Sequence, residues 1–445
     1  MPEIASPPAS TLTPAKTARQ RSDTLTSIWM IIAVAMALVT LVVKNRMPQP
    51  LWTMIHLVTL GVLSNGIFQW SWFFARSLAR LSADDPRARR HNTIRILIFN
   101  ACFLLLFVSM WLGWMVGTMI AATGIAAVAA WHGAEMLLVL RERLASRFVI
   151  VVRYYVCSAS FFVLAALLAS FVSATMFSPS IPEAMVAMRD RLTLAHALSG
   201  VAGWVGLTIG GTVITLGPTI LRTRMSPDAV SGGVRVLLPW CLSLLLAIAG
   251  ALLGVMPLVG AGILAVGTCA IVGIVYPYAK VLRNKGPREY SAWSFLLGLL
   301  WISVGVCALG VASLFVSTPS QLRALTLMWL PIIGIAGFAQ LFQGALSYLM
   351  PVVIGGGPSV VRIGIAIIDW QYSLRLGLRN SALILELFLF FTSDSPSVHV
   401  LRMAGWFLVI ATFVIDVVIY AKTGVTQARA RRARSETLSE SRQVQ

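Results

Sequence analysis

The stretch LAHALSGVAGWVGLTIGGTVITLGPTILRTRM, residues 194–225, is a long apolar run that begins beside a histidine and ends at two arginines. A helix of about 20 apolar residues crosses the hydrocarbon core of a bilayer. His196, Gly203, Gly210 and Gly217 follow one another at intervals of seven residues, so they fall along one stripe of a helix. Because glycines let neighbouring membrane helices approach closely, the stripe predicts a helix inside a bundle, with His196 facing its neighbours.

The rest of the chain has the same apolar character. Of its 445 residues 58% are hydrophobic and 11% are charged, and the mean hydropathy is +0.83, whereas soluble proteins have about 25% charged residues. The composition therefore predicts an all-α integral membrane protein. We count twelve candidate transmembrane helices, near residues 25–43, 52–74, 94–113, 114–138, 149–173, 193–217, 234–254, 258–279, 290–314, 325–349, 374–393 and 400–421.

The net charge of +19 follows this topology. With the N-terminus in the cytoplasm, twelve spans place all but six of the 35 Lys and Arg residues on the cytoplasmic side, as the positive-inside rule requires. We therefore expect a multi-pass protein of the cytoplasmic (plasma) membrane with both termini in the cytoplasm. Its partner is the lipid bilayer, and the basic excess does not indicate a nucleic-acid partner.

Three parts of the chain are distinguished by composition. Residues 1–24 are rich in Pro, Ser and Thr and are expected to be a disordered cytoplasmic tail. Residues 25–421 form the predicted twelve-helix membrane domain, and residues 422–445 form a basic cytoplasmic tail suited to anionic lipid. The span at 374–393 is the least regular, because Arg375 and Arg379 must snorkel to the interface for it to cross.

Three apolar segments echo one another: IHLVTLGVLSNGI at 55–67, AHALSGVAGWVGL at 195–207 and MWLPIIGIAGFAQ at 328–340. Each begins with a ring, that of His56, His196 or Trp329, placed four or five residues before a glycine. The five cysteines show no such pattern, because each lies in a different span and no CxxC occurs. We expect no disulfide and no zinc knuckle.

The histidines are the candidate metal ligands. His56 and His196 begin helices that enter the bilayer from the same face, so they come at a similar depth, and His399 lies at the same level. Three imidazoles are a ligand set for copper or haem. The alternative is that they are polar helix-end residues bonded to backbone or water. His132 and Glu135 share a helix face near Arg141, where an ion-pair cluster is favoured over metal binding.

Other polar residues inside spans are candidates for proton transfer or for contacts between helices. Glu386 is the carboxylate nearest the middle of a span, where a charge is costly. It is either a proton site or a neutral, hydrogen-bonded acid. Gln340 and Gln343 form a polar stripe with Ser347, for which hydrogen bonding between helices is the favoured interpretation.

The segments HLVTLGVLSNGIFQWSWFF, LAHALSGVAGWVGLTIGGTVITLGPTILRTRM and GALSYLMPVVIGGGP resemble the membrane portion, without the cupredoxin domain, of proteins described as actinobacterial copper oxidases. More distantly the chain is similar to haem–copper oxidase subunit I and to NnrS. The resemblance implies a haem–copper oxidase subunit I-like bundle, haem b or copper as cofactor, and a cupredoxin or other redox protein as partner. It makes His56 a haem ligand and His196 a copper ligand.

Three functions remain open after this comparison. The first is haem or copper binding near the outer face, in redox, nitric oxide or copper handling. The second is a non-catalytic membrane scaffold or partner subunit, since segments 234–254 and 325–349 lack the histidines of the catalytic family. The third is a proton-coupled transporter. Whether the protein is an enzyme is not decided by these residues.

Overall fold

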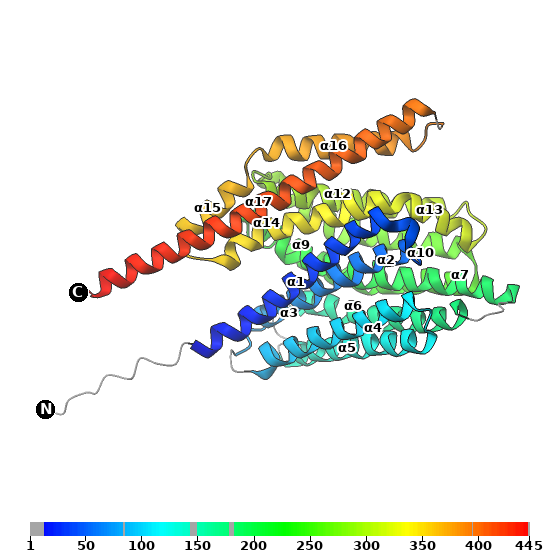
Figure 1. Ribbon diagram of the computed structural model, residues 1–445, viewed down its shortest axis with the longest axis horizontal. Helices are drawn as coiled ribbons and strands as arrows, with labels where there is room; N and C mark the ends of the chain where they lie inside the picture. Colours follow the sequence, from blue (N-terminus) through cyan, green and yellow to red (C-terminus); the bar gives the residue numbers. More distant parts are fainter. Residues whose placement is uncertain (1–12, 83–84, 143–148, 178–181, 394, 444–445) are drawn as a thin grey trace. The chain divides into compact units, whose positions relative to one another are not determined.

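The protein is all-helical in the computed structural model (Figure 1), which describes residues 13–82, 85–142, 149–177, 182–393 and 395–443. Several helices continue without interruption through wider, π-helical turns, marked η. The elements are α1 (Thr13–Val43), η1 (Lys44–Arg46, a 3-10 turn), α2 (Pro50–His56), η2 (Leu57–Ser64), α3 (Asn65–Leu78), η3 (Arg87–His91), α4 (Asn92–Trp111), α5 (Met115–Glu142), α6 (Val149–Met176), α7 (Glu183–Ala197), η4 (Leu198–Gly206), α8 (Leu207–Ile220), α9 (Pro227–Leu253), α10 (Met256–Ala270), η5 (Ile271–Val275), α11 (Tyr276–Asn284), α12 (Tyr290–Ser313), α13 (Pro319–Pro331), η6 (Ile332–Ala339), α14 (Gln340–Ile354), α15 (Pro358–Ile368), α16 (Tyr372–Leu389) and α17 (Pro396–Gln443).

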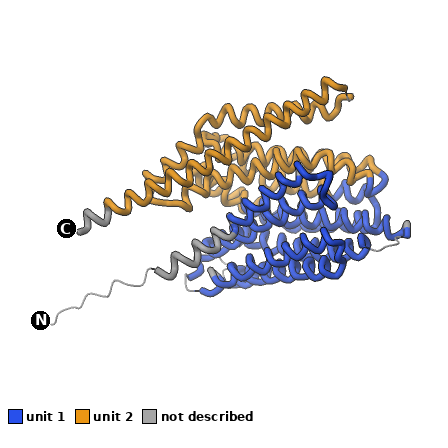
Figure 2. Tube along the Cα trace, viewed as in Figure 1, with its two compact units in different colours: residues 1–212, 233–262, 317–320 blue, residues 213–232, 263–316, 321–445 orange. Residues whose placement is uncertain are grey.

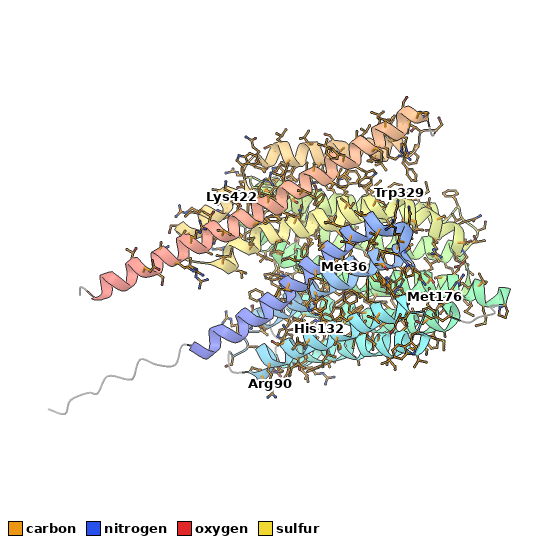
Figure 3. The ribbon with its side chains drawn as sticks, viewed as in Figure 1. Met36, Arg90, His132, Met176, Trp329 and Lys422 are labelled. Atoms are coloured by element: carbon orange, nitrogen blue, oxygen red, sulfur yellow. The ribbon has the colours of Figure 1, made fainter. Side chains whose placement is uncertain are left out.

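Ten helices in the described part of the chain are long and apolar enough to cross a membrane, which makes this a multi-pass membrane protein. They are Pro50–Leu78, Asn92–Trp111, Met115–Glu142, Val149–Met176, Ala184–Ile220, Pro227–Leu253, Met256–Asn284, Tyr290–Ser313, Pro319–Ile354 and Pro396–Thr437. Each coincides with one of the twelve predicted spans. Large apolar side chains remain exposed on these helices, and many of the side chains drawn in Figure 3 face outward, as contact with lipid requires.

The other two predicted spans are helical, but they are not both long and apolar enough to cross a membrane. In α1 the apolar part is Ile28–Thr40, which is shorter than a typical span. Helix α16 carries Arg375, Arg379 and Glu386 within its 18 residues. The structure therefore supports ten spans where the sequence predicted twelve.

The two predicted tails are partly helical. Helix α1 begins at Thr13, inside the expected tail 1–24, and residues 1–12 lie outside the described part. Helix α17 continues to Gln443, through most of the basic segment 422–445. Both terminal helices thus extend beyond their apolar stretches.

The chain divides into two compact units, coloured in Figure 2. Unit 1 comprises residues 1–212, 233–262 and 317–320, and in it α5 packs between α4 and α6. Unit 2 comprises residues 213–232, 263–316 and 321–445. There α12 packs on α14, and α16 and α15 both run beside the long helix α17 (Figure 1).

The echo in the sequence corresponds to a repeated backbone feature. A π-helical stretch begins one residue after His56, two after His196 and three after Trp329, in η2, η4 and η6 respectively. Such turns leave carbonyl groups that side chains can use: Ser64 Oγ donates to the Thr59 carbonyl oxygen at 2.8 Å. π-Helical turns are rare and are frequent at functional sites, which directs attention to the two histidines.

The glycine stripe on η4 and α8 packs as the sequence predicted. A Cβ at Gly203 would lie 2.5 Å from Cβ of Phe161 on α6, and a Cβ at Gly210 would lie 3.2 Å from the Trp240 ring on α9. Larger residues would hold these helices apart. The missing side chains therefore bring the helix that carries His196 against α6.

An ion-pair triad joins the segment before α4 to the end of α5. Arg87 donates to Asp85 Oδ2 at 2.7 Å and to Glu142 Oε1 at 2.6 Å. The hydrogen bonds from Arg87 hold the pKa of the Asp85 carboxyl below its usual range. Because the folded pKa is depressed, the contribution of Asp85 to stability is present above the ordinary Asp pKa of about 3.9 and is lost as the pH falls through the lowered pKa.

For the variant Arg87→Gln we expect the pKa of Asp85 to rise toward the ordinary value, because its main hydrogen-bond donor is removed. An NMR titration of the labelled Asp85 carboxyl measures this directly. An unchanged pKa in the variant would show that Arg87 is not the cause of the shift.

Candidate functional site

The structure brings His56 and His196 together in unit 1. The two imidazole ring centroids are 6.1 Å apart and the rings are nearly parallel, with an interplanar angle of 15°. His56 is the last residue of α2 and His196 is next to last in α7, so each ring lies immediately before a π-helical turn. The equal depth expected from the sequence therefore corresponds to lateral proximity as well.

Each ring of this histidine pair is held by a backbone carbonyl. The Nδ1 atom of His56 is 2.8 Å from the Trp52 carbonyl oxygen, and Nδ1 of His196 is 2.8 Å from the Ala165 carbonyl oxygen on α6. A carbonyl only accepts hydrogen bonds, so in the neutral rings the proton is on Nδ1 and the lone pair is on Nε2. This is the arrangement found in metal-binding histidines, where the second nitrogen is oriented by a carbonyl or carboxylate.

The histidine pair lies beside an aromatic side chain and has few further metal-ligating side chains around it. Trp52 stacks on His56 with ring centroids 4.3 Å apart. Across the described residues, no group of three or more His, Cys, Asp or Glu side chains is placed to hold a metal ion. His399, the third ligand expected from the sequence, is an exposed residue of α17 in unit 2. The site thus consists of two imidazoles.

A second polar cluster in unit 1 surrounds His132 and Glu135 on α5; His132 is labelled in Figure 3. Glu135 Oε1 accepts hydrogen bonds from His91 Nδ1 at 2.7 Å and from Trp131 Nε1 at 3.0 Å. His132 Nε2 lies 3.0 Å from Ser71 Oγ. The sequence predicted Arg141 as the nearby cation. Glu135 is instead hydrogen-bonded to His91, a half-exposed residue at the end of η3, directly before α4.

Arg95 on α4 is the cation at the centre of this second cluster. Its side chain is fully buried, with the guanidinium carbon 4.7 Å from the centre of the Trp72 ring. One of its nitrogens, Nη2, donates to Asn92 Oδ1 at 3.2 Å. The Nε and Nη1 atoms of Arg95 have no hydrogen-bond partner among the described residues.

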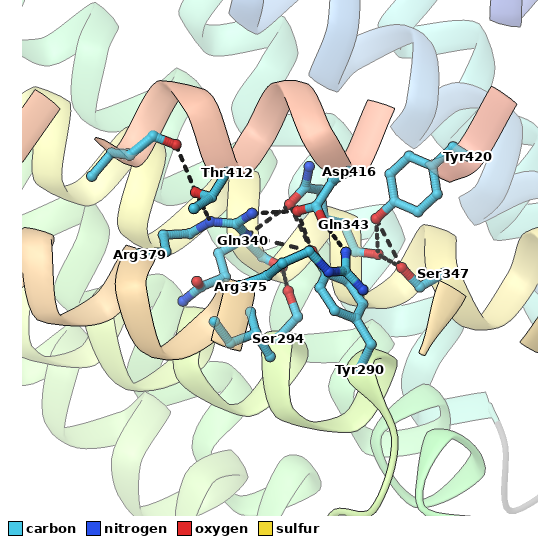
Figure 4. A network of polar contacts seen from close by, with 12 residues as sticks. Tyr290, Ser294, Gln340, Gln343, Ser347, Arg375, Arg379, Thr412, Asp416 and Tyr420 are labelled. Carbon is cyan, nitrogen blue, oxygen red and sulfur yellow. Dashed lines mark hydrogen bonds and ion pairs between the residues drawn. The ribbon is translucent and has the colours of Figure 1, made fainter. Parts of the chain in front are cut away.

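In unit 2 a buried network is built on one carboxylate between two guanidinium groups, as Figure 4 shows. Asp416 on α17 accepts hydrogen bonds from Arg375 and Arg379 on α16 and, at 2.6 Å, from the Tyr290 hydroxyl on α12. Asp416 and Arg379 are 0% exposed and Arg375 is 4% exposed. The sequence predicted that both arginines would snorkel to the interface. They are buried instead, because Asp416 neutralises one of the two charges and backbone oxygens accept the remaining donors of Arg375.

The predicted polar residues of α14 belong to this network. Gln343 Oε1 accepts a hydrogen bond from Arg379 Nη1 at 3.0 Å, and Gln340 exchanges hydrogen bonds with Asn380 at 3.1 and 3.2 Å. Ser347 Oγ lies 2.8 Å from the Tyr420 hydroxyl. All these contacts join α14 to α16 and α17, as the interpretation of hydrogen bonding between helices requires.

Glu386 lies on the same helix as the two arginines but outside their network. Its side chain is buried, and Oε1 has no hydrogen-bond partner in the described part of the chain. Gly405 on α17 faces it so closely that a Cβ there would collide with Oε1. The candidate proton site predicted from the sequence is therefore a buried carboxyl against a glycine, within unit 2.

Two of the cysteines are not isolated as the sequence indicated. The thiols of Cys157 on α6 and Cys241 on α9 are hydrogen-bonded to each other. Both are free cysteines. Their spacing of 84 positions in the chain gives no sequence signal of this contact.

Arg95 and the Arg375–Asp416–Arg379 arrangement were not identified as sites from the sequence. A signal was present in the second case. Arg375 and Arg379 are four residues apart, on one helix face, and Asp416 is a single carboxylate in an otherwise apolar run. Charges inside membrane spans pair with one another, so a carboxylate on one span and two arginines on its neighbour predict such a pairing.

The fold and these sites define a polytopic, all-helical membrane protein. No protein-family model matches the chain, and no curated protein matches it significantly. The class of the protein therefore rests on its own helices, and its function has to be argued from its sites.

Proposed function

We propose that this protein binds a monovalent copper ion between His56 and His196 and acts in copper or redox handling in the membrane. The observation that carries the proposal is the separation of the two rings. Metal–imidazole bonds are about 2 Å long and a ring nitrogen lies about 1 Å from its centroid, so two imidazoles that share one ion have centroids no more than about 6 Å apart. The pair has a separation of 6.1 Å.

The donor set favours copper(I) over other ions. Imidazole nitrogen suits zinc, copper, nickel and iron, but zinc requires about four ligands. Copper(I) accepts two, which is the number of side chains that the pair supplies. Haem is the alternative that the resemblance to the oxidases implies, and His56 and His196 would then be its two histidine ligands. Bound at this pair, copper would supply a one-electron centre or a cargo ion, and a cupredoxin would be a suitable partner.

The test is metal analysis of the protein purified in detergent, loaded with copper(I) under anaerobic conditions. We expect one copper per chain in the wild type and almost none in the double variant His56→Ala, His196→Ala. X-ray absorption should give about two nitrogen ligands at about 2 Å. The matched control is His399→Ala, which removes an exposed imidazole and should keep the copper.

Three other outcomes contradict the proposal. A Soret band that disappears in the double variant would assign the pair to haem. Copper content unaffected by the double variant would place the copper at another site and leave the two histidines as packing residues. No metal in a stable wild-type protein would favour the membrane scaffold.

A further inference from the structure

The polar cluster around Arg95 has more buried donors than acceptors. Besides Nε and Nη1 of Arg95, the Trp72 Nε1 and His132 Nδ1 atoms have no hydrogen-bond partner among the described residues. All three side chains are at most 1% exposed. The cluster also contains one unpartnered acceptor, Glu135 Oε2. His132 Nδ1 is a further donor when Ser71 donates to Nε2 of the same ring. Buried polar groups are nearly always hydrogen-bonded, so the unpartnered N–H groups of Arg95 and Trp72 require an explanation.

These groups lie close together although they come from three helices. Trp72 on α3 faces Arg95 on α4 at 4.7 Å, measured from the guanidinium carbon to the ring centre. His132 on α5 contacts Ser71, the neighbour of Trp72. The ring centre of Trp131, also on α5, is 5.8 Å from the same guanidinium carbon. The open donors therefore lie near one another inside unit 1.

The charges of the cluster indicate what this region binds. A buried cation that is not directly paired with an anion is strongly unfavourable. Glu135 is the nearest carboxylate to Arg95, but its Oε1 accepts hydrogen bonds from His91 and Trp131 and its Oε2 has no hydrogen-bond partner among the described residues. Arg95 itself donates only to the neutral side chain of Asn92 among these residues. We infer that Arg95, Trp72 and His132 form a binding site for a small monovalent anion of the size of chloride, nitrite or nitrate. Such an anion accepts hydrogen bonds from several N–H groups and brings a negative charge into direct contact with the guanidinium.

The inference is independent of the copper proposal, because it uses a different set of residues. It is tested with the whole protein in nanodiscs of zwitterionic phosphatidylcholine, so that lipid phosphate carries no net charge. The thermal unfolding midpoint is measured while gluconate is replaced by chloride, nitrite or nitrate at constant ionic strength. We expect a saturable rise, since a ligand bound to the folded state stabilises it, and no rise with sulfate.

Three variants separate specific binding from a general salt effect. Trp72→Phe keeps an aromatic ring and removes one donor, so the apparent dissociation constant should rise by about tenfold or more. Glu135→Gln removes the nearest negative charge and should tighten binding. Arg153→Gln changes an exposed guanidinium on α6 and should leave the response unaltered.

Three results would overturn the inference. They are a wild-type protein with no saturable response, a response unchanged by Trp72→Phe, and a response that occurs only in Glu135→Gln. The last would mean that Glu135 itself neutralises Arg95, directly or through water. It would show the cluster to be an internal ion pair with no anion site.

Discussion

Replacing Asp416 by Asn is expected to destabilise the protein by about 3–5 kcal/mol, the usual effect of removing one partner from a buried ion pair. The wild-type carboxylate accepts hydrogen bonds from Arg375, Arg379 and Tyr290. In the variant two guanidinium charges remain buried without a carboxylate. The amide NH2 group of Asn, itself a hydrogen-bond donor, then lies against the N–H and O–H donors that the carboxylate accepted. The shape is nearly unchanged, so the loss measures charge and hydrogen bonding rather than packing.

The measurement is reversible unfolding by SDS in mixed micelles, with Asp228→Asn as the matched control. Asp228 pairs with Lys280 at 3.0 Å in the same unit, but both side chains are exposed, by 59% and 45%. An exposed pair contributes about 0–1 kcal/mol. Equal effects of the two substitutions would contradict the buried position of the Asp416 network.

The membrane helices could be predicted well from the sequence because their signal is local. An apolar run of sufficient length identifies its own helix, whichever neighbours it later contacts. The prediction was less accurate for α16, where the cost of Arg375 and Arg379 was assigned to snorkelling. Their burial depends on Asp416, which lies on another helix, 37 residues from Arg379. Neutralisation of a buried charge by a residue on another helix is a tertiary interaction, so it cannot be detected from the hydropathy of each span taken separately.

The candidate sites could also be predicted from the sequence only in part. Depth along a helix follows from residue counting, which placed His56 and His196 at one level. Lateral position does not, so the 6.1 Å separation emerges only when the helices pack. Arg95 illustrates the limit further. In sequence it begins an apolar run after a basic segment and is indistinguishable from an interfacial arginine. Its burial depends on Trp72 from α3 and Trp131 from α5.

The second large effect is expected from Gly344→Ala, a change of a single methyl group. Gly344 on α14 lies against α12, where an added Cβ would collide with the backbone nitrogen of Phe295. It would also come within 2.8 Å of the Phe295 Cα and the Ser291 carbonyl oxygen. These atoms belong to a helix backbone, which cannot rotate away as a side chain can. The two helices must therefore separate, at a cost of about 1–3 kcal/mol or more.

Gly334 in η6, on the same continuous helix as Gly344, provides the control. A Cβ at Gly334 would meet no atom within 4 Å, so Gly334→Ala should be neutral or stabilise the protein by about 0.5–1 kcal/mol through the lower flexibility of alanine. Helix propensity favours alanine at both positions, and only the proximity of α12 distinguishes them. Opposite signs for the two variants in the same SDS titration would therefore establish that Gly344 permits close packing of α12 and α14. If Gly344→Ala stabilised the protein as well, that packing would be looser than the described contacts indicate.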